Sequence, residues 1–196
     1  MTTPRPTPAS SPGATAANDP RSAGARAADH YLRLYLTNHW LASKGGLDLF
    51  ERSARSQHDE ETRASLRALA DEVADDRTTL RSILDAHGVP DTPIRERLVS
   101  LGETVGRLKP NGTLFRRSPL SDLLELEALG AAVQAKKLGW LALRELADDD
   151  ERLDVATLDD LVHRAEDQQD RLEGLRLKAA RALYPAARTP HPTRQV

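Results

Sequence analysis

Histidine and carboxylate side chains interrupt the apolar stripes of several predicted helices, and such groups can bind metal ions. His39 falls in one apolar series at helical spacing, and Asp76 falls in the next such series. Glu72 lies one turn before Asp76, and Glu166 lies on the last predicted helix. One imidazole and up to three carboxylates suit Fe, Mn or Zn. One hypothesis is therefore a metal site in the core, formed by His39, Asp76, Glu72 and Glu166.

The same positions also fit a core polar network without metal. Counted from the turn between the first two helices, His39, Asp76, Gln134 and Gln169 lie about 14 to 17 residues in, or roughly 21 to 26 Å. A carboxylate that accepts hydrogen bonds from an imidazole and two amides is satisfied, and such a layer can fix helix register. Buried polar groups usually find partners and seldom do chemistry, so this network is favoured over the metal site.

A second polar level is predicted nearer that turn. Glu127 and Arg176 lie about 7 to 8 residues in, opposite Gly46. Opposite charges at one buried level form a structural ion pair far more often than a catalytic pair. Ser118 and Ser121 have no histidine and aspartate partners placed by any sequence argument. No catalytic residue is therefore predicted.

A basic segment follows the second long helix and surrounds an Asn-Gly turn, with Phe115 nearby. It could bind an anion or an acidic partner. The alternative is a loop that merely pins the connection to the bundle, with Leu114 and Phe115 as anchors. The candidate contact residues are Arg107, Lys109, Arg116 and Arg117.

Four long amphipathic helices are predicted to position all of these groups, because apolar residues recur at helical spacing. Asp29 is the predicted N-cap of the first helix, and Gly45 and Gly46 in its middle suggest close approach of another backbone. On the third helix, the predicted inward series is Leu120, Leu124, Glu127, Ala131, Gln134, Leu138 and Leu141. The predicted helices span 29–55, 59–87, 119–147 and 156–184.

The connections between these helices are short, then long, then short. The long one, about 30 residues with a short helix predicted over 93–108, can travel the length of the bundle. The third helix can then begin where the second began, which gives two antiparallel hairpins joined by a crossover. Residues 28–184 form the predicted bundle domain, and the segments 1–27 and 185–196 are predicted to be disordered tails.

Composition fits one globular domain with tails. Of 196 residues, 39% are hydrophobic and 30% charged, and the formal net charge of −2 provides no global attraction for nucleic acid or an anionic membrane. Cysteine is absent, which excludes disulfides and thiolate sites. The chain starts without the apolar region of a secretory signal and has no membrane-length apolar run. A soluble, cytoplasmic, all-α protein is predicted.

This chain resembles the ferritin-like superfamily over residues 29–184, on helix length and topology more than on motif. Members with di-metal sites carry a glutamate on their first and third helices. Here His39 stands in place of the first glutamate, and Gln134 stands at the matching height on the third helix.

The second and fourth helices of such members carry Glu-x-x-His. This sequence has Glu72-x-x-Asp75 and Glu166-x-x-Gln169 instead, so no helix keeps the full pattern. The resemblance implies a bundle with an incomplete or lost di-metal site, and argues against ferroxidase or oxygenase chemistry. The leading hypothesis is a non-catalytic helical protein that acts through protein–protein contacts, including self-association. The alternative is a metal-binding or metal-dependent redox protein that uses the reduced site.

Overall fold

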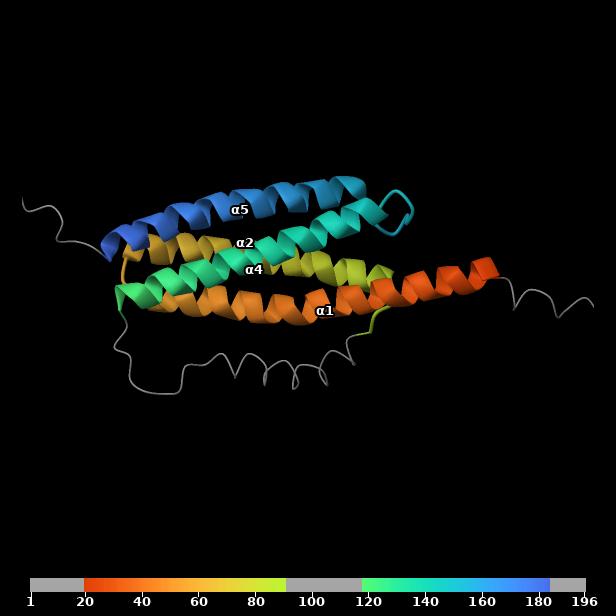
Figure 1. Cartoon of the computed structure of the whole chain (residues 1–196), viewed down its shortest axis with the longest axis horizontal. Helices are drawn as coiled ribbons and strands as arrows, with labels where there is room; N and C mark the ends of the chain where they lie inside the picture. Colours follow the sequence, from red (N-terminus) through yellow and green to blue (C-terminus); the bar gives the residue numbers. More distant parts are fainter. Residues whose placement is uncertain (1–19, 91–117, 184–196) are drawn as a thin grey trace, which may run out of the picture.

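The structure is a computed structural model that describes residues 20–90 and 118–183 (Figure 1). Over these ranges the chain forms four α-helices and no strand, which confirms the all-α prediction. No helix in the described ranges has the length and apolar character needed to cross a membrane. The helix predicted over 93–108, the basic residues of its connection and the segment 185–196 lie outside the described residues. The helices are α1 (Pro20–Ser56), α2 (Glu60–Ala86), α4 (Pro119–Leu146) and α5 (Val155–Ala182).

Local capping signals explain where three of these helices begin. Asp59 caps α2 by accepting a hydrogen bond from the Thr62 amide at 2.8 Å. Ser118 caps α4 through a capping box with Ser121, and Asp154 caps α5. Such caps satisfy amide groups that the first helical turn leaves unpaired. These boundaries lie within two residues of the predicted ones because each cap is encoded locally.

The start of α1 differs from the prediction. The helix begins at Pro20, so residues 20–27, predicted to be disordered, belong to it. Proline is tolerated in a first turn, and the segment that follows is rich in alanine and arginine, which favour helix. Asp29 is therefore inside the helix and not its N-cap. Its carboxylate accepts hydrogen bonds from Arg33 at 2.7 Å and from Arg152 at 3.0 Å.

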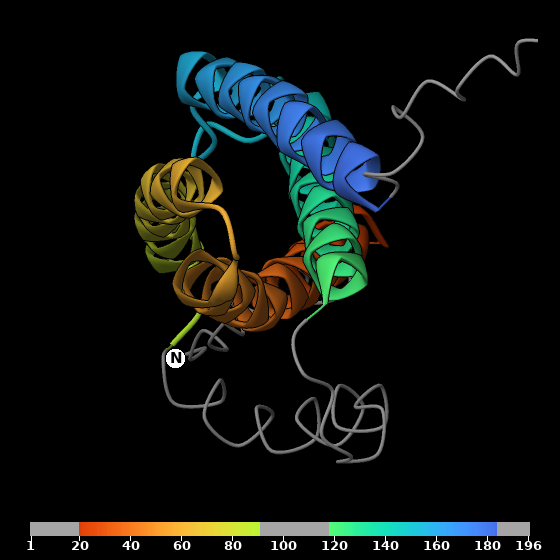
Figure 2. The same cartoon turned by 90° about the vertical axis from the view of Figure 1, so that its left-hand side faces the viewer.

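The four helices lie around a common axis, with α2 and α4 at one diagonal and α1 and α5 at the other (Figure 2). At one end, His58 in the α1–α2 turn contacts Asp122 in the first turn of α4 at 2.7 Å. At the other end, His87 after α2 contacts Asp150 after α4 at 3.3 Å. Because their first turns share one end and their last turns share the other, α2 and α4 run parallel.

The core consists of aliphatic side chains from all four helices, but α4 presents a different face from the predicted one. Leu120, Leu124, Leu138 and Leu141 are exposed by 51%, 54%, 55% and 43%. The buried apolar side chains of α4 are Leu126, Leu129, Val133, Trp140 and Leu143. This helix carries two apolar stripes at helical spacing, and packing against α1 and α5 selects the second.

Candidate functional site

Asp76 of α2 is the most deeply buried carboxylate of the described chain, with 1% of its surface exposed. Lys136 of α4 donates a hydrogen bond to it, and Arg164 of α5 lies 2.9 Å from its other oxygen. The fully buried Gln168 of α5 donates to it at 3.5 Å and accepts from Lys136. Three helices therefore contribute to one polar cluster, and two cations balance the buried charge.

Glu72 extends this cluster by one helical turn along α2. Arg171 donates to it at 2.8 Å, and Gln168 donates at 3.1 Å. The Arg171 guanidinium is the largest cause that holds the pKa of Glu72 below its ordinary value. Burial lowers the pKa of Lys136, an effect that the neighbouring Asp76 partly offsets. Both acidic groups are thus occupied by cations and amide donors of the protein itself.

The four residues of the metal hypothesis are not brought together as a set. Glu166 is exposed and pairs with Lys137 at 3.7 Å on the surface. Glu72 and Asp76 share Gln168, while the His39 ring packs against Gly139 of α4. In the described part of the chain, no three His, Asp or Glu residues are grouped so that they could hold a metal ion.

The two glutamines of the predicted mid-bundle layer contact each other, but at the surface and apart from Asp76. Gln169 donates a hydrogen bond to Gln134, and both lie on the outer side of the α4–α5 seam. Glu127 and Arg176 approach to 3.7 Å, with exposures of 47% and 32%, so this ion pair is not buried as predicted. The reason is the rotated face of α4, since a step of one residue turns a side chain by about 100°. In the core, the amide partner of Asp76 is Gln168.

His39 lies half-buried between α1 and α4. Its ring packs 4.5 Å from the ring of Tyr35, with the two planes tilted by 59°. A Cβ atom at Gly139 would lie only 2.8 Å from the His39 ring, so the absence of a side chain there makes room for it. Burial lowers the pKa of His39, because it disfavours the charged imidazolium. Gly45 and Gly46, by contrast, have no atom near enough to require glycine.

A cavity of about 210 Å³ lies beside His39, between α1, α2 and α4. Aliphatic and aromatic side chains form most of its wall, and Asp76 and Lys136 reach it from the polar cluster. Trp140 also lines it, and the buried Nε1 of its indole has no hydrogen-bond partner among the described residues. Buried donors are normally satisfied, so this one is an exception with a cavity beside it.

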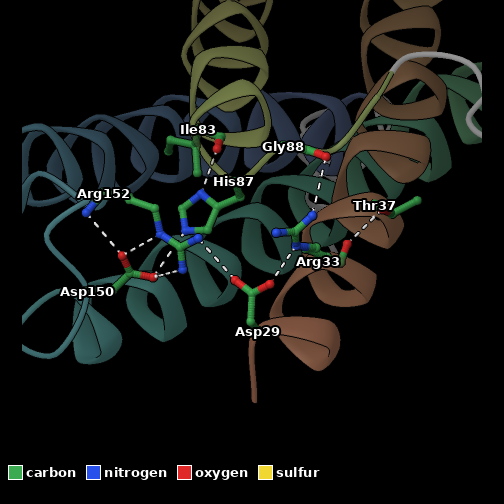
Figure 3. Close-up of polar contacts among 8 residues, drawn as sticks. All are labelled: Asp29, Arg33, Thr37, Ile83, His87, Gly88, Asp150 and Arg152. Atoms are coloured by element: carbon green, nitrogen blue, oxygen red, sulfur yellow. Dashed lines mark hydrogen bonds and ion pairs between the residues drawn. The ribbon is translucent and has the colours of Figure 1, made fainter. Parts of the chain in front are cut away.

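A second polar cluster lies at the end of the bundle where α2 and α4 end (Figure 3). His87 is buried; its Nδ1 donates to the Ile83 carbonyl at 2.7 Å, and its Nε2 faces Asp150 at 3.3 Å. Arg152 donates to both Asp150 and Asp29. This cluster, which we call the end cluster (Asp29, Arg33, His87, Asp150 and Arg152), connects α1, α2 and the α4–α5 turn.

Helical spacing in the sequence places two unpredicted members of the buried cluster, Lys136 and Gln168, on inward-facing stripes. Lys136 falls in the spacing Leu129, Val133, Trp140 and Leu143, which is the stripe that packs inward. Gln168 similarly lies between Ala165 and Leu172 on α5. The end cluster has no such signal, because its members come from three separate segments and meet only in the folded chain.

No protein-family model, no curated protein and no solved structure matches this chain.

Proposed function

We propose that this protein is a non-catalytic helical bundle that self-associates through the outer face of α4. The observation that carries the proposal is a row of four half-exposed leucines on that face: Leu120, Leu124, Leu138 and Leu141. Single exposed leucines are ordinary on protein surfaces, but a row along one helix is typical of an interaction surface. We call this row, with Glu127, Ala131 and Gln134 between its halves, the α4 outer stripe.

The spacing of the stripe favours a second copy of the chain as the partner. Steps of three and four residues alternate along it, as in the seam of a coiled coil. Leu120 and Leu141 lie almost equally far from Ala131, and so do Leu124 and Leu138. In an antiparallel pair of α4 helices centred on Ala131, each leucine of one copy therefore meets a leucine of the other. A two-fold interface requires such self-complementarity.

The polar positions of the stripe fit the same arrangement. Glu127 and Gln134 also lie almost symmetrically about Ala131, so Glu127 of one copy would face Gln134 of the other. A carboxylate then meets an amide donor, and the two glutamates stay apart, which avoids like-charge repulsion. Ala131 and the neighbouring Gly130 are small, and allow the two helices to approach closely at the centre.

Sedimentation equilibrium of the full chain tests this proposal. The wild type should form a concentration-dependent dimer, and the double substitution Leu124→Glu/Leu138→Glu should leave a monomer with unchanged helicity. Tyr31→Glu is the matched control, since Tyr31 is exposed by 69% but lies on α1. A wild type that stays monomeric at high concentration, or a dimer that survives the double substitution, contradicts the proposal.

We infer further that the bundle is of the ferritin-like type, in the sense of two hairpins joined by a crossover. The parallel course of α2 and α4 supports this inference, because α2 ends and α4 begins at opposite ends of the bundle.

A further inference from the structure

We propose that the cavity between α1, α2 and α4 binds a small carboxylate whose apolar body is about the size of one ring. The apolar body would fill the cavity, and the carboxylate would pair with the guanidinium of Arg77 on α2. This inference is independent of self-association, because the leucines of the α4 outer stripe are not part of the cavity wall.

The size and the wall of the cavity set the body of the ligand. An engineered cavity of about 150 Å³ lined by aliphatic side chains takes up benzene. The cavity here is about 210 Å³, and Phe50, Val73 and Leu80 belong to its apolar wall, so it admits a ring with a short substituent. Ala42 and Ala135 also line it and are exposed, so the cavity reaches the surface between α1 and α4.

Arg77 provides a cation at the wall of this cavity. Its Nε donates a hydrogen bond to Ser43 Oγ at 3.0 Å, and both residues line the cavity. Its Cζ lies 3.7 Å from the centre of the Trp40 ring. The two terminal nitrogens donate to no group of the described chain, and they are accessible, because the buried polar atoms without a partner belong to other side chains. A ligand carboxylate can therefore accept hydrogen bonds from both of them.

Arg77 differs from the neighbouring Arg81 in having no carboxylate partner. Arg81 lies one turn further along α2 and also over the Trp40 ring, at 5.4 Å, but it pairs with Asp85 at 2.6 Å. Arg77 forms no ion pair in the described ranges, and burial lowers its pKa, an effect that the nearby Asp48 partly offsets. A half-buried cation without a counter-ion favours an anionic ligand.

The other charged groups of the wall do not cancel this preference. Asp76 is the one acidic residue among the described residues that line the cavity. It is paired with Lys136, which also lines the cavity, and with Arg164 of α5. Two cations and one carboxylate therefore line the cavity, and a bound carboxylate balances Arg77 without displacing Lys136 from Asp76.

Two probes of nearly equal shape test the role of charge. Phenylacetate and phenylacetamide differ in one group, a carboxylate in place of a neutral amide. Titration of the full-length protein, followed by its amide signals in two-dimensional NMR, gives both affinities. We expect phenylacetate to bind with a Kd of about 0.1–1 mM. It should bind roughly 5-fold or more tightly than phenylacetamide, since charge-assisted hydrogen bonds are about twice as strong as neutral ones.

Substitutions of the two arginines test the carboxylate contact. Arg77→Gln should remove the preference for phenylacetate and leave the affinity for phenylacetamide largely unchanged. Arg81→Gln is the matched control, because it also removes a cation over Trp40 but from a residue that does not line the cavity, and it should keep the preference. Arg77→Met takes the place of Arg77→Gln if that variant fails to fold.

Adjacent glycines test the location of the apolar body. Gly46 lines the cavity and Gly45 does not, and an added Cβ meets no atom within 4 Å at either position. Gly46→Leu should fill the cavity and abolish binding of both probes, while Gly45→Leu should bind as the wild type does. Ala135→Leu fills the same cavity from α4 if Gly46→Leu fails to fold.

Binding of phenylacetate that disappears in the filled variant, and that exceeds binding of phenylacetamide only while Arg77 is present, supports the proposal. Absence of any shift at the solubility limit of phenylacetate, equal affinity for the two probes, a preference that survives the loss of Arg77, or binding that survives both filled variants would overturn it.

Discussion

Gly139 is the residue at which a missing side chain decides how closely α1 and α4 approach. A Cβ there would lie 2.8 Å from Cε1 and 3.0 Å from Nδ1 of His39. Glycine within a helix is less stable than alanine by about 0.5–1 kcal/mol, so its presence is explained by this contact. The sequence shows several mid-helix glycines but does not indicate which one is in close contact, because the answer depends on the neighbouring helix.

Gly139→Ala should therefore destabilise the protein although it raises helix propensity. Displacement of the His39 ring by the new methyl group should lower the free energy of unfolding by about 1–3 kcal/mol, as overpacking does elsewhere. Urea denaturation followed by circular dichroism measures the change.

Two further variants isolate the cause. Gly174→Ala, where no atom lies within 4 Å, should instead raise stability by about 0.5–1 kcal/mol. In a His39→Ala background, Gly139→Ala should also become stabilising. If Gly139→Ala and Gly174→Ala change stability alike, the contact with His39 has no energetic role.

At the scale of helices, the sequence predicts where each helix begins better than it predicts which face of a helix is buried. Three helix starts were predicted closely because Asp59, Ser118 and Asp154 cap their own helices. The orientation of α4 was wrong because both of its stripes have helical spacing, and only tertiary packing distinguishes them. The same error moved Gln134 and Glu127 from the predicted core to the surface.

Asp76 was correctly predicted to be a core residue of α2, but its partners were not predicted. It accepts from Lys136 of α4 and Gln168 of α5, whereas the prediction gave it His39 and two other glutamines. The partners depend on the mutual rotation of three helices, which no single stripe encodes. Gln134 and Gln169, and likewise Glu127 and Arg176, are thus paired outside the core, and the buried cluster joins Asp76 to partners that were not predicted.

Loss of Lys136, whose side chain reaches α2 and α5 from α4, should lower the free energy of unfolding. Lys136→Met leaves the buried Asp76 with Arg164 and Gln168 only, and should lower the free energy of unfolding by about 2–4 kcal/mol. The double variant Asp76→Leu/Lys136→Met removes both charges and should recover most of that loss, since apolar replacements of buried pairs are often neutral. Urea denaturation of both variants measures this difference. A double variant no more stable than Lys136→Met would show that the pair is not the source of the effect.

At the scale of the whole molecule, polar contacts at both ends join the two hairpins. At one end, His58 in the α1–α2 turn contacts Asp122 of α4. At the other, the end cluster links α1, the end of α2 and the α4–α5 turn through Asp150 and Arg152 (Figure 3). The aliphatic core between them is non-directional, so these contacts are suited to fix how the hairpins align.

The end cluster should make stability depend on pH on the acidic side. Hydrogen bonds from Arg152, the largest cause, and from His87 hold the pKa of Asp150 well below its ordinary value. A carboxyl group of this kind contributes stability that is fully present above its unfolded pKa of about 4, and that is lost as pH falls through the lower folded value. Because the folded state favours the deprotonated carboxyl group, acid weakens the contacts of Asp150 with Arg152 in the same turn and with His87 at the end of α2.

We therefore expect Asp150→Asn to be less sensitive to acid than the wild type. Between about pH 7 and about pH 3, the wild type should lose roughly 1 kcal/mol more of its unfolding free energy than the variant does, after allowance for solvent screening. Urea denaturation at several pH values gives both curves. Asp149→Asn, an exposed neighbour in the same turn, should keep the wild-type pH dependence. Parallel curves for Asp150→Asn and the wild type would mean that the contacts of Asp150 do not contribute to the loss of stability in acid.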